Sequence, residues 1–243
     1  MIRMAVILAG GKALRLQPLT SNLPKSMLEI NGKPFIYHQL MMLKNQGIET
    51  IIICAGFKGN MLQEYVSSIK GCGLNVKFSF DGDIPLGTGG ALRKAYPLLD
   101  ESFFLMYGDS YFNIDLNIVS LNFAQDNKDA LMVVIKNDNR WDVSNVHFAN
   151  GALLGYNKLA PTCEMRHIDY GISVLNKKLL LEMPENTLCD LADFYSSLLA
   201  CGKMAGYEVT ERFYEIGSFS GITETAEYLS RLEGSKDGHS ELH

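Results

Sequence analysis

Short apolar segments alternate with segments of helical periodicity through the first half of the chain. Strands are expected at residues 4–8, 51–54, 76–80, 103–107 and 131–135. Helices are expected between them, at 36–43, 61–69, 91–99 and 116–124. Strand–helix–strand alternation predicts an α/β fold in which parallel strands are covered by helices on both faces.

The pattern changes after residue 139. Antiparallel strands are expected in the second half, followed by a helix, an extended segment and a closing helix, at 143–148, 153–156, 168–175, 188–200, 207–215 and 222–232. The sequence therefore predicts a Rossmann-like, doubly wound mixed sheet that carries a small antiparallel subdomain. We expect one domain over 1–233, with halves at 1–139 and 140–233, and a disordered polar tail over 234–243.

Composition excludes several classes of protein. The 243 residues are 47% hydrophobic and carry a net charge of −5, with no run of Lys or Arg, so binding to nucleic acid is not expected. No stretch approaches the length that spans a membrane, and the first residues do not form a signal peptide. The five cysteines include no C-x-x-C pair, which predicts a reduced, cytoplasmic protein.

The loops that follow the parallel strands are the expected site of ligand binding. In doubly wound sheets, ligands bind in a crevice outside the carboxyl ends of the strands. The loops after Leu8, Phe80 and Tyr107 should therefore converge on one crevice.

The first loop combines glycines with cations. Residues 8–25 read LAGGKALRLQPLTSNLPK, so Gly10 and Gly11 follow the first strand directly, and Arg15 and Lys25 add positive charge. Glycine allows backbone N–H groups to approach phosphate oxygens, and Arg and Lys neutralise phosphate charge. The loop lacks the G-x-x-x-x-G-K-[ST] and G-x-G-x-x-G patterns. A Gly-Gly pair after a strand, taken alone, is most often a plain turn.

Two further loops carry groups that suit a nucleotide and a metal. Residues 86–91 read LGTGGA and open a helix, whose N-terminus favours anionic phosphate. Residues 105–110 read LMYGDS, which places Asp109 just after a buried strand, where a carboxylate can hold Mg²⁺. Each segment alone is also compatible with an ordinary turn or helix cap.

Together these segments resemble the sugar-1-phosphate nucleotidyltransferases, whose signature is L-A-G-G-x-G-T-R-L-x-P-L-T followed by P-K. The resemblance extends over nearly the whole chain, and Ala13 and Leu14 are its two departures in the signature. Within the family, the segments PLGTGGAL, YGDSY, RWD-x-SNV and IDYG look most similar to mannose- and heptose-1-phosphate guanylyltransferases of capsule and lipopolysaccharide pathways. The resemblance implies a GT-A-like fold.

The resemblance also implies roles for particular residues. Arg15, Lys25, Asp109 and Lys158 would be catalytic, and Mg²⁺ would be the cofactor, held by Asp109 and Glu215, the latter replacing the family's Asp. Nucleotide contacts are expected from Leu8, Ala9, Gly10, Gly11, Asp81, Gly87, Thr88 and Gly89. Asp81 lies where many members have a Gln that reads the base, so the base is not fixed.

The second half would form the substrate-binding part of the site. Sugar-phosphate contacts are expected from Trp141, Asn145, Arg166, Asp169, Tyr170 and Gly171. Trp141 suits a sugar face and a packing role equally well. His167 is expected to be a structural residue.

The implied activity couples a nucleoside triphosphate, with GTP favoured, to a sugar 1-phosphate, with manno-configured hexose or heptose favoured. One alternative keeps the fold and makes the chain a cytidylyl- or uridylyltransferase for another sugar or a non-sugar phosphate. A second alternative is a regulator that binds a sugar nucleotide without turnover. The partners are then the two substrates, and a homodimer remains an option.

Overall fold

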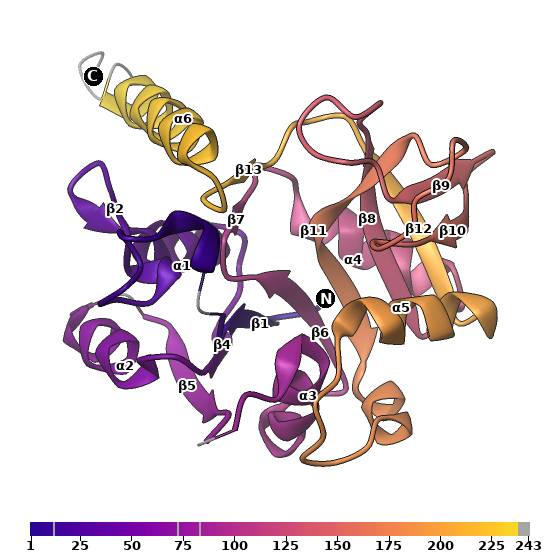
Figure 1. Ribbon diagram of the computed structural model, residues 1–243, viewed down its shortest axis with the longest axis horizontal. Helices are drawn as coiled ribbons and strands as arrows, with labels where there is room; N and C mark the ends of the chain where they lie inside the picture. The colour runs from indigo at the N-terminus through magenta and orange to yellow at the C-terminus, as the bar shows by residue number, and fades with distance from the viewer. Residues whose placement is uncertain (12, 72, 83, 238–243) are drawn as a thin grey trace.

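The computed structural model describes residues 1–11, 13–71, 73–82 and 84–237. Its centre is a nine-stranded sheet (Figure 1). Four parallel strands stand in the order β6-β1-β4-β5, with bounds Ser102–Tyr107, Met4–Ala9, Thr50–Ala55 and Asn75–Phe80. The predicted α/β fold with parallel strands in the first half is confirmed.

The sheet continues past β6 through the second half of the chain. Strand β11 (His167–Asn176) pairs antiparallel with β6, β8 and β9. The remaining strands of this part are β8 (Ala130–Lys136), β9 (Val146–Ala149), β10 (Ala152–Tyr156) and β12 (Met204–Val209). The predicted mixed sheet is confirmed, since antiparallel strands of the second half join the parallel strands through β11, which pairs with both β6 and β8.

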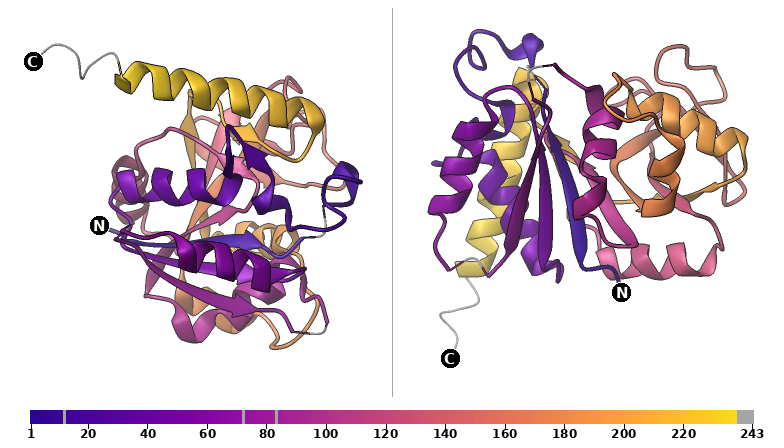
Figure 2. Two further views of the ribbon diagram at one scale, coloured as in Figure 1. Left: turned by 90° about the vertical axis from the view of Figure 1, so that its left-hand side faces the viewer. Right: turned by 90° about the horizontal axis from the view of Figure 1, so that it is seen from below.

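Helices cover both faces of the sheet (Figure 2). In β1, Ala5 and Ile7 face α1, α2 and α4, whereas Val6 and Leu8 face α3 and α5. Side chains of a strand alternate between its faces, so a strand buried on both sides is apolar throughout. The helices are α1 (Phe35–Asn45), α2 (Gly59–Ser68), α3 (Gly87–Lys94), α4 (Leu116–Gln125) and α5 (Leu191–Ala200).

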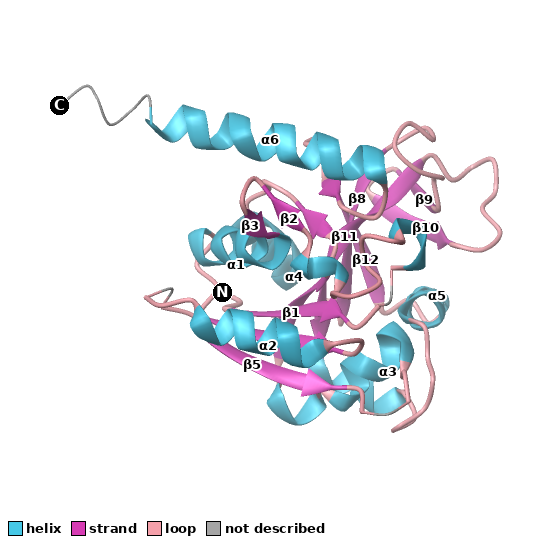
Figure 3. Ribbon diagram, turned by 60° about the vertical axis from the view of Figure 1, so that its left-hand side comes forward, coloured by secondary structure: helices cyan, strands magenta, loops and turns pink. Residues whose placement is uncertain are grey.

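The last helix, α6 (Phe219–Asp237), packs on a small third cluster (Figure 3). That cluster includes Leu16, Ile30, Phe35 and Leu229. Two pairs of short strands complete the fold, β2 (Glu29–Ile30) with β3 (Lys33–Pro34) and β7 (Ser110–Tyr111) with β13 (Tyr214–Glu215). The 3₁₀ helices are Leu14–Leu16, Lys25–Met27, Tyr96–Leu98 and Lys177–Glu182. No helix among the described residues is both long and apolar enough to cross a bilayer.

Several predicted boundaries are wrong. The strand expected from residue 143 begins at Val146, because Ser144 is tied to a turn through its hydroxyl, which accepts from the Asn139 N–H at 3.0 Å. The extended segment expected at 207–215 is two strands with different partners, β12 beside β8 and β13 beside β7. The expected tail begins too early, since α6 runs to Asp237, and the rest of that tail lies outside the described residues.

Backbone hydrogen bonds join the start of α3 to the segment before α5. The N–H of Gly89 donates to the Cys189 carbonyl at 2.9 Å, and the N–H of Cys189 donates to the Leu86 carbonyl at 3.0 Å. A Cβ at Gly90 would overlap the carbonyl oxygen of Thr187. The glycines of the LGTGGA segment therefore permit this close backbone approach between the start of α3 and the segment before α5.

Replacing Gly90 by Ala should destabilise the protein by about 1–3 kcal/mol, because neither backbone can shift without losing these hydrogen bonds. Gly234→Ala is the matched control, since a Cβ there meets nothing within 4 Å. The control should be neutral or slightly stabilising, as Ala is the better helix former. Urea unfolding of both variants measures the difference, and equal stabilities would contradict the packing argument.

Candidate active site

Two adjoining cavities lie at the carboxyl edge of the parallel strands. The strand-end cavity, of about 810 Å³, is bordered by the loops that follow β1, β4, β5 and β6. The larger cavity, of about 1110 Å³, lies toward β9, β10 and β11 and is named the hairpin-side cavity here. Residues common to both are Ala13, Lys25, Tyr107, Asp109 and Lys158.

The predicted convergence of three loops is confirmed. The strand-end cavity is lined by Leu8, Ala9, Gly10 and Gly11 after β1, by Asp81 and Gly82 after β5, and by Tyr107, Gly108 and Asp109 at the end of β6. The loops of β1 and β6 touch, since the N–H of Gly108 donates to the Leu8 carbonyl at 2.9 Å. A Cβ at Gly108 would lie 2.6 Å from that same oxygen, so glycine is required for this approach.

The LGTGGA segment contributes only partly to the cavity. Gly87 and Thr88 line it, but Gly89 lines neither cavity. The hydroxyl of Thr88 accepts from the Leu191 N–H at 2.8 Å and lies 3.2 Å from an Asp190 carboxylate oxygen, so it holds the start of α5. Gly89 instead lies close to Cys189 and Met183, where a Cβ would meet both residues, and its predicted nucleotide contact stays a prediction.

Lys25 and Asp109 meet at the junction of the two cavities. The Lys25 Nζ lies 2.6 Å from the Asp109 Oδ2, and the two side chains are 19% and 35% exposed. Lys25 opens a 3₁₀ turn after Pro24, and Asp109 follows β6. The pair therefore places one cation and one anion where both cavities open onto each other.

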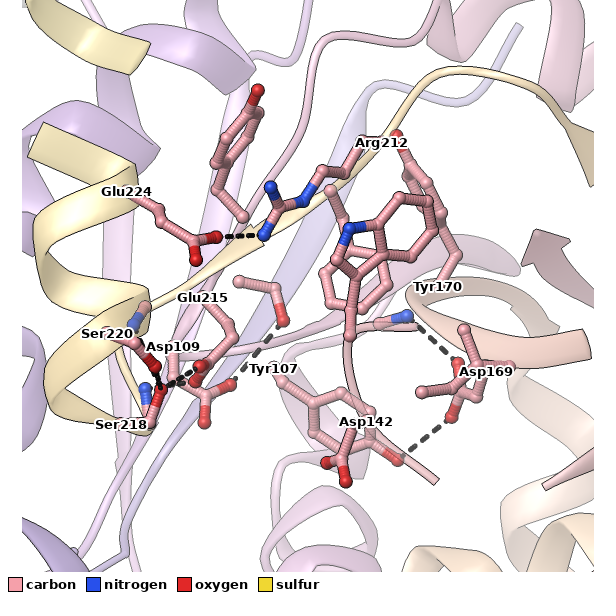
Figure 4. A pocket seen from close by; sticks show the side chains of 18 of the residues that line it. Tyr107, Asp109, Asp142, Asp169, Tyr170, Arg212, Glu215, Ser218, Ser220 and Glu224 are labelled. Carbon is pink, nitrogen blue, oxygen red and sulfur yellow. Dashed lines mark hydrogen bonds and ion pairs between the residues drawn. The ribbon is translucent and has the colours of Figure 1, made fainter. Parts of the chain in front are cut away.

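Glu215 reaches the same place from the other end of the chain. It pairs with Ser110 in the β7–β13 ladder, and the N–H of Ile216 donates to the Asp109 carbonyl at 3.0 Å. Its carboxylate accepts from the Gly217 N–H and, at 2.7 Å, from the Ser218 hydroxyl (Figure 4). Glu215 thus lies beside Asp109 while it closes the turn that begins α6.

The two carboxylates are suitable ligands for Mg²⁺. This ion prefers oxygen and commonly takes one or two carboxylates, with water and substrate phosphates as its other ligands. Among the described residues no group of three or more His, Cys, Asp or Glu could hold a metal, so Asp109 and Glu215 would need such additional oxygens. Two adjacent carboxylates facing a cavity fit that requirement, and the Mg²⁺ site stays a prediction.

Asp169 is a half-buried carboxylate that lines the hairpin-side cavity. Its backbone N–H donates to the Asn145 Oδ1 at 3.0 Å, and its Oδ1 accepts from the Gly171 N–H at 2.9 Å. The Tyr107 hydroxyl lies 3.4 Å from its other oxygen. Burial raises the pKa of Asp169 to about 6, although the Gly171 hydrogen bond and the Lys158 charge oppose this shift.

Other residues that were predicted to bind the sugar phosphate lie around the same cavity. Lys158 lines it, with its Nζ 6.0 Å from the centre of the Tyr107 ring. Gly171 has φ +88°, and a Cβ there would lie 2.7 Å from the Ser110 Oγ. Tyr170 is different, because its side chain is fully buried and packs against Phe112 and Phe213. Most of the Tyr170 side chain therefore belongs to the core.

The Trp141 ring packs against residues of a distant loop that precedes β13. Its ring lies edge-on to Phe213, with ring centres 6.2 Å apart. The guanidinium carbons of Arg140 and Arg212 lie 5.5 and 5.2 Å from the ring centre. These contacts agree with the packing role, while Trp141 also lines the hairpin-side cavity, so its sugar contact remains a prediction.

Arg166 is not brought to the site. It lines neither cavity, its side chain is 63% exposed, and its Nε donates to the Asp138 Oδ1 at 2.6 Å. The Arg166 carbonyl also accepts from Asn137 and Asp138, which fixes it beside that turn. The structure therefore places Arg166 outside both cavities, and its predicted sugar-phosphate contact stays a prediction. Its neighbour His167 is buried and bonded to Glu208 at 2.9 Å, as expected of a structural residue.

Sequence reasoning missed three residues of the site. Arg212 lines the hairpin-side cavity, packs on the rings of Trp141 and Tyr214, and is ion-paired with Glu224 of α6. No sequence signal indicated this position. Gly56 and Tyr107 could have been found, since each lies at the carboxyl end of a parallel strand, β4 and β6.

Comparison with known proteins agrees with this arrangement. A family model described as nucleotidyl transferase matches residues 4–142. Because this match covers more than half of the chain, the protein belongs to the nucleotidyl transferase family.

Particular relatives differ in the nucleotide their names specify. The chain is 36% identical over 118 residues to the D-glycero-α-D-manno-heptose 1-phosphate guanylyltransferase of Campylobacter jejuni, which covers 49% of this chain and 52% of that protein. It is 34% identical over 139 residues to the UTP–glucose-1-phosphate uridylyltransferase AglF of Haloferax volcanii, covering 57% and 55%. The chain thus matches about half the length of these curated relatives.

The fold has close counterparts among solved structures. The inositol-1-phosphate CTP transferase from T. maritima superimposes with a TM-score of 0.81 at 21% identity, covering 96% of each chain. At this identity the likeness concerns the fold alone. It agrees with the GT-A-like architecture expected from the sequence.

The raised pKa of Asp169 gives a pH-dependent stability. The folded protein holds this proton more tightly than the unfolded chain, so the contribution is fully present below about pH 4 and is lost as pH rises through about 6. Relative to Asp169→Asn, the free energy of unfolding of the wild type should fall by roughly 2–3 kcal/mol between pH 4 and 7. Urea unfolding across that range tests this, and a constant difference would refute it.

Proposed function

We propose that the protein transfers a nucleotidyl group from a nucleoside triphosphate, with GTP favoured, to a sugar 1-phosphate, giving an NDP-sugar and pyrophosphate. A manno-configured hexose or heptose is the favoured acceptor. The junction of the two cavities at Lys25, Asp109 and Lys158 is the observation that carries this proposal. One cavity would hold the nucleotide and the other the acceptor, with their phosphates meeting between them.

The proposed reaction is a displacement at the α-phosphorus of the nucleoside triphosphate. An anionic oxygen of the acceptor phosphate attacks the α-phosphorus, a new P–O–P linkage forms, and the bond to the departing pyrophosphate breaks. The attacking oxygen is already ionised near neutral pH, so no general base is required. Rate enhancement then depends on positioning and on charge stabilisation.

Each charged residue would have a definite task. Lys25 and Arg15, which lines the hairpin-side cavity, would stabilise charge on the transferred and departing phosphates. Lys158 would orient the acceptor phosphate. Asp109 and Glu215 would hold Mg²⁺, which supplies charge neutralisation at the nucleotide phosphates. Among these, Lys25 already contacts Asp109, so phosphate and metal contacts would be made side by side.

Support for a guanylyl and manno preference is the sequence resemblance and the guanylyltransferase relatives. A uridylyl- or cytidylyltransferase acting on another phosphate is the second candidate, because relatives with those names match at 34% identity. A binding protein without turnover is the third candidate. Pyrophosphate release separates all three.

The test measures pyrophosphate release with Mg²⁺ from each of GTP, CTP, UTP, ATP and dTTP. The acceptors are mannose 1-phosphate, a manno-heptose 1-phosphate, glucose 1-phosphate and inositol 1-phosphate. Release with GTP and a manno-configured acceptor supports the proposal. Release only with another pair supports the second candidate, and no release from folded protein supports the third.

Asp109→Asn should lower turnover by about 10²-fold or more, because the neutral amide cannot hold the metal or balance Lys25. Asp126→Asn is the control, since Asp126 is exposed at the end of α4 and lines neither cavity. Thermal unfolding should show that both variants fold. Wild-type turnover in Asp109→Asn would remove this residue from the site.

A further inference from the structure

Lys158 lies on a segment that has no regular structure to hold it. Strand β10 ends at Tyr156, and residues 157–160 are exposed and belong to neither a helix nor a strand. The Lys158 side chain forms no ion pair with any described residue, although it lines both cavities. A long side chain on such a segment has many conformations, so a defined position requires that its backbone be fixed.

The side chain of Asn157 fixes that backbone. Its Oδ1 accepts from the Leu159 N–H at 3.0 Å and from the Ala160 N–H at 2.8 Å. An asparagine that accepts from N–H groups two and three residues ahead closes a local turn. Lys158 is the first residue enclosed by this turn.

Further hydrogen bonds join this turn to Asp169. The Asn157 N–H donates to the Asn145 carbonyl at 2.9 Å, and the Asn145 Oδ1 accepts from the Asp169 N–H at 3.0 Å. The Asn145 N–H also donates to the carbonyl of His167 in β11 at 3.0 Å. Asn145 therefore connects the segment that carries Lys158 to the strand that carries Asp169.

The polar groups of Asn157 are directed at the backbone and not at either cavity. Asn157 lines neither cavity, whereas Asn145, Lys158 and Asp169 line the hairpin-side cavity. The Asn157 Oδ1 accepts two N–H groups, so both of its acceptor positions are used. Asn157 would therefore act on a bound substrate through the residues that it holds.

Lys158 and Asp169 are close enough to interact electrostatically. Burial raises the pKa of Asp169 to about 6, and the positive charge of Lys158 opposes this shift. A phosphorylated acceptor between the two side chains would meet a cation that suits its phosphate and a carboxylate that suits a hydroxyl group. The relative position of the two side chains would then set the orientation of the acceptor.

We propose that Asn157 is a positioning residue, which holds Lys158 beside Asp169 so that the acceptor phosphate is oriented for attack. This inference rests on the proposed function and adds to it a residue that does not touch the substrate. Loss of the Asn157 oxygen would free the Lys158 backbone, and a displacement of about 1 Å at a positioning group can greatly slow a reaction that depends on orientation.

The experiment compares Asn157→Ala, which removes the accepting oxygen, with Asn157→Asp, which keeps it. With the substrate pair that the wild type uses best, kcat/KM for the acceptor should fall about 10-fold or more in Asn157→Ala, chiefly through KM. In Asn157→Asp it should fall by less than about 3-fold, because a carboxylate can accept the same two N–H groups. Nucleotide binding measured by calorimetry should change little in either variant, since Asn157 lines no part of the strand-end cavity.

The pKa of Asp169 is a readout that a merely structural role would not move. If Lys158 is no longer held nearby, its charge opposes the effect of burial less, so the pKa of Asp169 should rise above the wild-type value in Asn157→Ala. A carbon-13 NMR titration of the carboxyl groups measures this pKa. The Asp169 signal is assigned by its absence from the spectrum of Asp169→Asn.

Asn176→Ala is the matched control. The Asn176 Oδ1 also accepts a backbone N–H, that of Lys178 at 3.1 Å, and Asn176 lines neither cavity. This variant should also lose a little stability in urea, while it keeps the wild-type acceptor kcat/KM and the wild-type pKa of Asp169. Acceptor kinetics in Asn157→Ala that match those of the control would overturn the inference. Equal losses for nucleotide and acceptor, or an unchanged pKa of Asp169, would overturn it as well.

Failure of this inference differs from failure of the proposed function. Pyrophosphate release by the wild type, with an unaltered acceptor kcat/KM in Asn157→Ala, would leave the function intact and remove Asn157 as a positioning residue. A raised pKa of Asp169 in Asn157→Ala, without pyrophosphate release from any pair, would support the positioning of Lys158 and refute the transferase. No release together with an unchanged pKa would overturn both.

Discussion

The parallel pairing of β6, β1, β4 and β5 sets the distances on which the candidate site depends. Because the four strands run in one direction, their carboxyl ends meet at a single edge, and the loops that follow them line one cavity. The contact between Gly108 and the Leu8 carbonyl closes the space between the two central loops. The spacing of the strands then fixes how far Asp81 lies from Asp109, before any side chain conformation is considered.

A second constraint comes from the short pairing of β7 with β13. It joins residues more than a hundred positions apart, and it puts Glu215 opposite Ser110 and therefore beside Asp109. The same segment carries Arg212, which packs on Trp141 and is ion-paired with Glu224 of α6. One backbone connection thus positions the second carboxylate and a wall of the hairpin-side cavity together.

The lining of the strand-end cavity could be predicted from the sequence better than the lining of the hairpin-side cavity, because the first depends on local sequence signals. Short apolar runs and glycine-rich loops are local signals, so β1, β5, β6 and their converging loops could be located from the chain alone. Arg212 and the packing of Gly89 on Cys189 depend on contacts between distant segments, which leave no local pattern. Arg166 was predicted to contact the sugar phosphate because it lies just before the Asp169-Tyr170-Gly171 segment, and its ion pair with Asp138 could be seen only in three dimensions.

The first loop shows how such a motif records a backbone requirement. The family signature has glycine where this chain has Ala13, and Ala13 adopts φ +47°, in the left-handed region that favours glycine. The loop holds this conformation because the Ala13 carbonyl accepts from the Leu16 N–H at 3.0 Å and from the Thr20 hydroxyl at 2.9 Å. Thr20 is the last residue of the PLT part of the signature, so the threonine and the glycine position belong to one turn. Since Ala13 lines both cavities, that turn directs the loop between them, and its shape is retained here at some cost in backbone strain.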